Sequence, residues 1–224
     1  MPNERQRILV IRQSGGDVAV TIDAEEVDRL ELSLEVFRAI YQSSAAKGWG
    51  HFGLVVQAYS KRALPVLHYL NRLADQQGDE IPLRLVKGAY WDSEIKESQQ
   101  LGVDGYPVYT RKACTDVAYL ACAQFLLSDD TRGRIFPQFA THNAHTVTTI
   151  LELANQDSRP FEFQRLHGMG ERLHDILLSE TKGHCRIYAP VGAHRDLLAY
   201  DPLADRWSET DDAAVNYMMV ALRD

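Results

Sequence analysis

The stretch LRLVKGAYW, residues 83–91, shows the plan on which the whole chain is built. Leu83–Val86 has the composition of a strand, and a cluster of polar, small and aromatic residues follows it directly at 87–91. In a parallel α/β protein, ligands bind beyond the carboxyl ends of the strands, on barrels and on open sheets alike. The same pairing of a strand with a polar cluster recurs along the chain, and this recurrence indicates the fold class.

Strand-like and helix-like segments alternate on both sides of this stretch. The other β-prone runs are Val18–Ile22, Gly53–Val56, Arg134–Phe136, Phe161–Phe163 and Cys185–Tyr188, which makes six strands in all. Between them, apolar residues recur at the helical period in Leu30–Ile40, Leu64–Leu73, Val117–Phe125 and Val147–Leu153. This alternation predicts a parallel sheet with helical crossovers, as an open sheet or a barrel. No G-x-G-x-x-G motif follows an early strand, so the barrel is favoured over a Rossmann fold.

Length and composition are typical of one soluble domain. The chain has 224 residues, of which 45% are hydrophobic and 25% charged. A net charge of −7 argues against a nucleic-acid partner, which needs basic side chains. Three cysteines without a C-x-x-C pair predict reduced thiols and a cytoplasmic protein. The apolar run Ile8–Ile11 is too short for a signal peptide or a membrane span, so any membrane contact is expected to be peripheral, at the inner membrane.

The polar clusters after the strands suggest two kinds of site. In a cofactor site, donors to phosphates and to a heterocycle would come from several clusters, with Tyr90 or Trp91 as an apolar wall. These donors are Gln57, Arg84, Lys87, Thr141, His142, Asn143 and Gln164. In a metal site for hydrolysis, His142, His145 and His167 would join Asp23. The metal site is the weaker hypothesis, because His142 and His145 lack the helical i, i+4 spacing.

Single residues also have structural explanations that compete with the functional ones. Asp23, at a strand end, is a candidate N-cap for the next helix as well as a catalytic group. Arg84 lies inside a strand, where a buried arginine is costly unless it is paired, which favours a function. Tyr188 and Tyr200 could be packing residues. Gly168–Gly170 reads most simply as a loop.

Longer sequence motifs resemble successive barrel segments of the proline dehydrogenase family, especially its bifunctional bacterial branch, proline utilisation A. The motifs occur in the family's order, from about Val18 to Tyr200. They are DAEE at 23–26, VQAY at 56–59, RLVKGAYWD at 84–92, YPV at 106–108, TRK at 110–112, PQFATHN at 137–143, FQRLHGMG at 163–170 and YAPVG at 188–192. So many matching motifs in the same order are not expected by chance.

The resemblance implies an incomplete (β/α)8 TIM-type barrel. About six strands are recognisable, corresponding to strands three to eight of the family, in a barrel fragment spanning 18–200. Residues 1–17 form a divergent N-terminal segment and residues 201–224 a divergent C-terminal tail, for which one short helix at 211–222 is predicted. A full barrel typically needs ~250 residues. The open barrel edge predicts self-association.

The resemblance also implies an activity and a set of site residues. FAD would take a hydride from L-proline, give Δ1-pyrroline-5-carboxylate and pass the electrons to a quinone. Arg84, Asp23 and Tyr188 would be catalytic, and Tyr90, Leu166 and Tyr200 would bind the substrate. The FAD would be lined by Gln57, Arg84, Val86, Gly88, Ala89, Trp91, Lys112, Thr141, His142, Asn143 and Gln164.

One segment departs from the family. Where the family carries an arginine pair that grips the carboxylate of proline and helps hold the flavin, this chain reads DPLA at 201–204. A lysine that the family uses near the same carboxylate is not recognisable in the N-terminal segment. The sequence therefore leaves an alternative open: a catalytically inactive, truncated remnant, or a module that another chain completes.

Overall fold

The computed structural model describes residues 19–157, 159–181, 183–191, 200–201, 206–207 and 218–222. The chain divides into two compact units, the first ending at Phe161 and the second beginning at Glu162. Each unit is described by itself below. The predicted segment 1–17 and most of the predicted tail lie outside the described residues, so those boundaries stay predictions.

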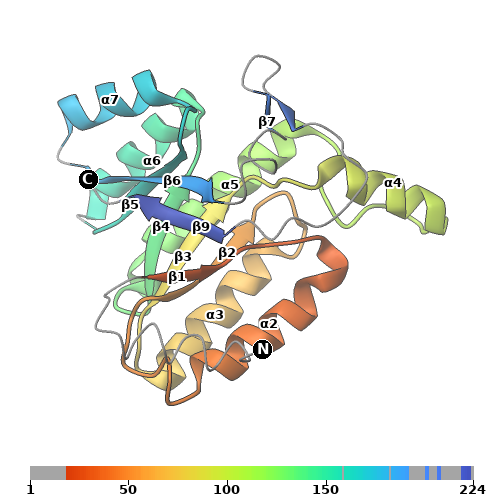
Figure 1. Ribbon diagram of the computed structural model, residues 1–224, viewed down its shortest axis with the longest axis horizontal. Coiled ribbons are helices and arrows are strands. Elements are labelled where there is room, and N and C mark those ends of the chain that lie inside the picture. Colours follow the sequence, from red (N-terminus) through yellow and green to blue (C-terminus); the bar gives the residue numbers. More distant parts are fainter. Residues whose placement is uncertain are drawn as a thin grey trace. The chain divides into compact units, whose positions relative to one another are not determined.

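The first unit contains a parallel sheet with helices in its connections (Figure 1). Its strands are β1 (Val20–Ile22), β2 (Phe52–Gln57), β3 (Ile81–Val86) and β4 (Ile135–Ala140), paired in that order and all parallel. Its helices are η1 (Val27–Arg29), α2 (Leu30–Tyr41), α3 (Ala63–Gln77), α4 (Trp91–Leu101), α5 (Lys112–Leu127), η2 (Asp129–Thr131) and α6 (Ala144–Asp157). The predicted parallel α/β alternation is confirmed in this unit.

The strand register sorts side chains onto two faces of the sheet. Leu83 and Leu85 of β3 are fully buried on the face where α5 packs, together with Phe139 of β4. The intervening position, Arg84, pairs in register with Val55 of β2 and with Gln138 of β4. Because side chains alternate along a strand, these three point to the opposite face. One face of the sheet is thus an apolar core beneath helices, while the other carries polar groups.

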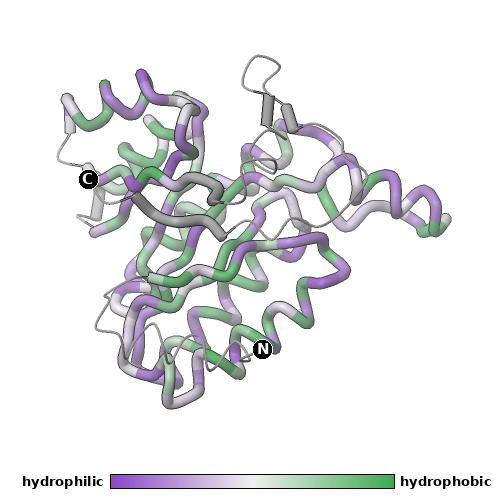
Figure 2. The backbone as a smooth tube through the Cα atoms, viewed as in Figure 1, coloured by the Kyte–Doolittle hydropathy of each residue, from purple (hydrophilic) through white to green (hydrophobic). Residues whose placement is uncertain are grey.

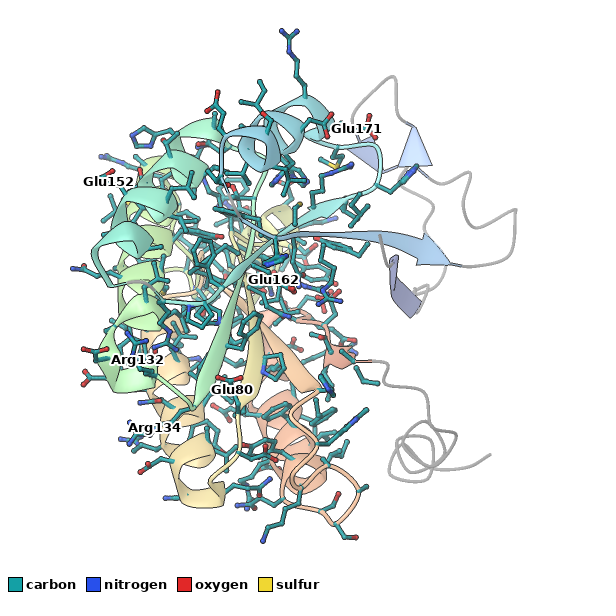
Figure 3. The ribbon with its side chains drawn as sticks, turned by 90° about the vertical axis from the view of Figure 1, so that its left-hand side faces the viewer. Glu80, Arg132, Arg134, Glu152, Glu162 and Glu171 are labelled. Carbon is teal, nitrogen blue, oxygen red and sulfur yellow. The ribbon has the colours of Figure 1, made fainter. Side chains whose placement is uncertain are left out.

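The amino-terminal ends of β3 and β4 are held by charged groups (Figure 3). Arg134, just before β4, forms an ion pair with Asp75 of α3 at 2.8 Å. The guanidinium of Arg159 donates to three carbonyl oxygens, those of Ser128, Thr131 and Ile135, at 2.7–2.9 Å. These contacts tie helix ends to strand starts, which is a stabilising role at the end of the sheet opposite the polar clusters.

The second unit continues the alternation with β5 (Glu162–Leu166), α7 (Glu171–Glu180) and β6 (Cys185–Val191), and β5 and β6 are parallel. Beyond them, β7 (Tyr200–Asp201) pairs with β8 (Arg206–Trp207), and β9 (Met218–Leu222) is antiparallel to β6. The predicted helix at 211–222 is therefore wrong at 218–222. Of these residues only Val220 is strongly β-prone, so pairing with β6 overrides the helix propensity of the Met, Ala and Leu residues.

Two helices were not predicted from the spacing of apolar residues in the sequence. The first, α4, is polar along most of its length, and α7 begins at Glu171 directly after the predicted loop Gly168–Gly170, which the structure confirms as a turn. Gly168 and Gly170 both have positive φ, 81° and 62°. Among the described residues, no helix is both long and apolar enough to cross a bilayer.

Candidate cofactor and substrate site

Four strand tips of the first unit meet at one edge of the sheet. Since β1 to β4 are parallel and neighbours in order, the residues after each strand lie side by side there. Asp23 follows β1, Gln57 ends β2, the 86–91 segment follows β3 and the 141–143 segment follows β4. The structure therefore brings together the predicted site residues of this unit.

Arg84 is the buried charge at this edge. It is 8% exposed, and its Nη1 lies 3.8 Å from Oδ2 of Asp23. Asp23 itself is largely exposed, and its Oδ1 accepts the N–H of Ala24 at 3.0 Å. The N-cap of η1 is Glu26, so the prediction that Asp23 caps the next helix is wrong. Asp23 instead faces the guanidinium of Arg84, the counter-charge that a buried arginine requires.

Gln57 ties two of the strand tips together. Its Nε2 donates to the carbonyl of Glu25 at 2.8 Å, and its Oε1 accepts the N–H of Ala89 at 2.9 Å. The side chain is 8% exposed, so both bonds are shielded from water. Gln57 thus holds the loop after β1 and the loop after β3 at a fixed spacing.

The loop after β3 depends on a glycine. Gly88 has φ 143°, a conformation that L side chains rarely adopt, and a Cβ placed on it would lie 2.5 Å from the ring of Tyr59. The close approach lets main chain, rather than side chain, cover the buried ring. Further along, Nε1 of Trp91 donates to the carbonyl of Tyr109 at 2.9 Å, while the indole stays 41% exposed. Trp91 therefore offers an oriented aromatic surface.

Tyr90 lies between this loop and the loop after β1. Burial raises the pKa of its hydroxyl, and the neighbouring carboxylates of Glu26, Asp23 and Glu25 raise it further. Tyr90 consequently keeps its proton at neutral pH and can donate a hydrogen bond. The structure places it within electrostatic reach of Asp23, as expected for two residues of one pocket.

Two lysines share one carboxylate near the same edge. Nζ of Lys112 lies 2.7 Å from Oδ2 of Asp116, and Nζ of Lys87 bonds to Oδ1 of the same residue. Hydrogen bonds from Lys112 and then from Lys87 lower the pKa of Asp116. Two ammonium groups against a single carboxylate leave a local excess of positive charge, which suits an anionic group such as a phosphate.

The segment after β4 joins the site to helix α6. Thr141 is buried, and its Oγ1 accepts the N–H of Asn143 at 3.2 Å. Oδ1 of Asn143 accepts the N–H of Thr146 at 3.0 Å, which is an N-capping bond for α6. His142 lies between them, half-buried. The predicted ligand residue Asn143 therefore also has a structural role.

The second unit carries the remaining predicted residues on β5 and β6. Gln164 is 1% exposed, and its Nε2 donates to Oε1 of Glu162 at 2.7 Å. Leu166 pairs in register with Tyr188, which is 8% exposed, at the carboxyl ends of these parallel strands. Tyr200 begins β7, and its side chain lies outside what the structure describes.

Three groups near the site were not predicted. They are Gln138, which is beside Arg84 in the sheet, Asp116, which is between the lysines, and Glu94, which contacts the loop after β1. A correct strand register would have revealed Gln138, but Glu94 and Asp116 need tertiary contacts to be found. In the part of the chain that the structure describes, no three His, Cys, Asp or Glu side chains gather in a way that could hold a metal ion, so the metal hypothesis finds no support.

A small cavity lies behind the loop after β1. Its volume is about 40 Å³, and its lining includes Glu25, Val27, Leu34, Val56 and Val66. Asp23 and Gln57 also line it, so this cavity adjoins the polar edge formed by the strand tips.

Comparisons with known proteins agree with this arrangement. The family model described as "Proline dehydrogenase" matches residues 5–213. "Bifunctional protein PutA" of Escherichia coli K12 is 50% identical over 206 residues, covering 89% of this chain and 15% of that protein. "Proline dehydrogenase 1" of Bacillus subtilis is 30% identical over 179 residues, covering 79% of this chain and 50% of that protein.

Solved structures give the same result. A Bradyrhizobium japonicum proline utilization A variant has a TM-score of 0.79 and 54% identity, covering 88% of this chain and 21% of that one. The Bdellovibrio bacteriovorus protein has a TM-score of 0.77 and 34% identity over 87% of this chain. The matches confirm the predicted incomplete (β/α)8 barrel, and the chain spans only 15–16% of the bifunctional curated relatives. The chain belongs to the proline dehydrogenase family.

Proposed function

We propose that this chain is the FAD-dependent proline-oxidising part of a proline-catabolic flavoprotein, converting L-proline to Δ1-pyrroline-5-carboxylate and passing the electrons to a quinone. The observation that carries the proposal is Arg84, a guanidinium buried on the polar face of the sheet 3.8 Å from Asp23, at the edge where four strand tips meet. The family match supports the substrate, since the relatives are named for proline dehydrogenation or proline utilization.

The donor set of this edge fits a flavin dinucleotide. Such a cofactor carries phosphates, a polar heterocycle with carbonyl oxygens, and flat ring surfaces. The edge supplies the ammonium groups of Lys87 and Lys112, the guanidinium of Arg84 and the exposed indole of Trp91. Val86, Gly88, Ala89, Thr141, His142, Asn143 and Gln164 complete the proposed cofactor-binding set together with Gln57.

A bound FAD would supply the two-electron acceptor for the hydride of the ring CH₂ next to nitrogen, the carbon without the carboxylate, while the ring nitrogen gives up its proton as the C=N bond forms. The protein's part is to bind, orient and stabilise. A fixed cation at Arg84 favours the negative charge that develops on the reduced ring. Asp23 faces that cation, and burial of the Arg84 side chain limits its contact with water.

The proline pocket is proposed to lie beside Arg84. Tyr90, held in its protonated form, offers a hydroxyl donor, and Asp23 offers a carboxylate for the ring nitrogen of the substrate. The proline-binding roles of Leu166, Tyr188 and Tyr200 stay proposals that rest on the resemblance. The protein is proposed to act in the cytoplasm, with peripheral contact at the inner membrane where the quinone is found.

The alternative of an inactive remnant is not favoured. The family model extends over residues 5–213, and the cofactor motifs are intact in sequence. The replacement of the arginine pair by DPLA at 201–204 is expected to weaken the binding of proline first, and also the hold on the flavin that the resemblance assigns to the pair. Self-association through an open barrel edge remains a proposal for the isolated chain.

The proposal is tested by cofactor binding and turnover measured on the same preparation. FAD is titrated into the apo chain and followed by quenching of flavin fluorescence, and then L-proline is added with an artificial electron acceptor. We expect saturable FAD binding, acceptor reduction that depends on both FAD and L-proline, and formation of the cyclic imine. Acceptor reduction that is equal with and without L-proline would reject the proposed activity.

A further inference from the structure

Helix α4 docks onto the first unit through polar side chains. Its two buried residues are Glu94 and Ser98, which are 3% and 6% exposed, and Figure 2 shows the helix largely in hydrophilic colours. Leu101, at its carboxyl end, is instead 70% exposed. An amphipathic helix normally buries an apolar stripe, so the hydrophobic effect alone does not explain how α4 is seated.

The contact that seats α4 is a hydrogen bond to the loop after β1. An Oε1 oxygen of Glu94 accepts the main-chain N–H of Val27 at 2.6 Å, across 67 positions of sequence. The N–H of Val27 opens η1, and no side-chain cap bond comes from Glu26, the N-cap residue of η1. Glu94 therefore supplies, from another helix, the acceptor that a local capping residue would normally provide.

The same loop is tied down at two other points. The Nε2 group of Gln57 donates to the carbonyl of Glu25, and Nη2 of Arg62 lies 3.3 Å from the carbonyl of Val27. The contacts from Glu94 and Gln57 are made by buried side chains, whereas the contact from Arg62 is exposed. Asp23, the residue that faces Arg84, lies at the start of this loop, four positions before Val27.

The placement of Glu94 is unfavourable apart from this bond. Burial raises the pKa of its carboxyl group, and Glu97, Asp28 and Glu26 raise it further, while the bond from Val27 lowers it. The interaction that offsets the burial of the carboxylate is thus the one that holds the loop.

We propose that Glu94 is a positioning residue for proline binding: its bond to the Val27 amide fixes the 23–29 loop and thereby holds the Asp23 carboxylate opposite Arg84. This inference rests on the proposed function, because the group it positions belongs to the proposed proline pocket. Glu94 contacts neither substrate nor cofactor and acts through Val27 and Asp23.

The test uses the full chain with FAD and compares three variants with the wild type. Glu94→Ala removes the acceptor, and Glu94→Gln keeps an oxygen acceptor in nearly the same shape. Glu152→Ala, on α6, removes an exposed carboxylate that does not act on Glu94, and is the charge-matched control. The readouts are hydrogen exchange of the Val27 amide, KM and kcat for L-proline, and FAD affinity.

We expect Glu94→Ala to accelerate Val27 exchange about tenfold or more and to raise KM for L-proline by roughly five- to tenfold, as the loss of one charge-assisted hydrogen bond allows. The FAD affinity should change by less than about twofold. Glu94→Gln should restore both values, and Glu152→Ala should leave both unchanged. An unchanged exchange rate, or faster exchange with an unchanged KM, would overturn the proposal.

A second variant covers the case in which Glu94→Ala does not fold. Val27→Pro removes the donor rather than the acceptor, and proline is tolerated at the first position of a helix. The preceding residue, Glu26, already has φ −60° and ψ 157°, which a following proline permits. We expect the same rise in KM, and an unchanged KM would count against the proposal. Absence of proline turnover in the wild type would instead refute the proposed function itself, whatever the exchange rates show.

Discussion

At the scale of single residues, the site is built around a charge that the apolar pattern of its strand does not explain. Arg84 interrupts Leu83 and Leu85, both fully buried on the other face, and is itself 8% exposed. A buried guanidinium costs several kcal/mol unless oppositely charged groups and acceptors compensate it. Asp23 lies opposite it at 3.8 Å, an ion pair rather than a short hydrogen bond.

Replacement of Arg84 tests its proposed role. Arg84→Met keeps much of the volume without the charge, and we expect the rate of flavin reduction by L-proline to fall about 10²- to 10³-fold, the usual effect of removing one preorganised electrostatic group. Rapid-mixing absorbance measures this rate. Arg134→Met, at the opposite end of the sheet, is the control and should retain the rate. A rate within about threefold of the wild type for Arg84→Met would contradict the assigned role.

Gly88 is the second residue whose identity follows from its geometry. Gly88→Ala forces a side chain into φ 143° and within 2.5 Å of the Tyr59 ring, so we expect a loss of about 2 to 4 kcal/mol in the free energy of unfolding, measured with urea. Gly78→Ala is the control, because φ there is 69° and no atom lies within 4 Å of the added Cβ. That control should lose about 1 to 2 kcal/mol. Equal losses at both positions would show that Tyr59 does not restrict position 88.

Sequence reasoning identified the charged and aromatic residues of the edge, but not how they are held. Arg84, Asp23 and Tyr90 could be predicted, because a charge inside a strand and polar residues after it stand out from the apolar pattern. Glu94 and Asp116 could not, because each bonds to a group far along the chain or across a loop. The interpretation of Asp23 as a helix cap failed for a local reason: the chain runs on to Glu26 before η1 begins.

At the scale of elements, parallel strands in register explain why residues far apart in sequence share one edge. All six predicted strands are present, and their cores were correctly located, because alternating or continuous β-branched runs are a strong signal. Helix α4 was missed because its buried positions are polar. Helix α7 was missed because its ten residues carry only a short apolar pattern. Boundaries were displaced by a few residues, as at β4, which extends to Ala140.

At the junction of β4 and α6, variants of Asn143 can distinguish its helix-capping role from a role in ligand binding. Asn143→Ala should destabilise the fold by about 1 kcal/mol through loss of the bond to Thr146, as seen in thermal or urea unfolding. Asn143→Ser should restore most of this stability because serine also caps helices. If the amide group of Asn143 also donates to FAD, both variants should bind FAD about fivefold more weakly. An unchanged FAD affinity in the serine variant would confine Asn143 to capping.

The link between β3 and α5 predicts a pH effect. The pKa of Asp116 is lowered by Lys112 and Lys87, so its stabilising contribution is present above its unfolded-state pKa and is lost as pH falls through the lower folded-state value. Asp116→Asn should therefore lower the free energy of unfolding, measured with urea at neutral pH, by less than about 1 kcal/mol for so exposed a pair. The difference from the wild type should shrink only below about pH 4. A difference that persists undiminished in acid would exclude this ion network as its source.

At the scale of the whole molecule, the family match and the local geometry point to the same edge of the sheet. The chain covers 15–16% of the length of its bifunctional relatives, yet the sequence motifs proposed to bind the cofactor run from β2 to β5 without interruption. The fold class could be predicted from the alternation of strands and helices alone. The prediction of FAD as cofactor and of proline as substrate needed the family's sequence motifs. The spacing of apolar residues shows which positions are buried, but it does not show which reaction a protein catalyses.

The altered segment at 201–204 predicts that the chain binds its substrate weakly. Each charge-assisted contact to a carboxylate contributes about 1.5 to 3 kcal/mol, so the absence of an arginine pair should weaken proline binding roughly 10²-fold or more relative to relatives that have it. The concentration of L-proline at half-maximal flavin reduction measures this, with a bifunctional relative as the reference. Equal half-saturating concentrations would mean that other groups hold the carboxylate.

The most direct test of the central claim is the visible spectrum of the FAD-loaded chain before and after anaerobic addition of L-proline. The account predicts a bound oxidised-flavin spectrum that high concentrations of L-proline bleach, that D-proline leaves unchanged, and that bleaches far more slowly in Arg84→Met. A bound flavin whose spectrum no concentration of L-proline alters, or a folded chain that takes up no FAD at all, would contradict it.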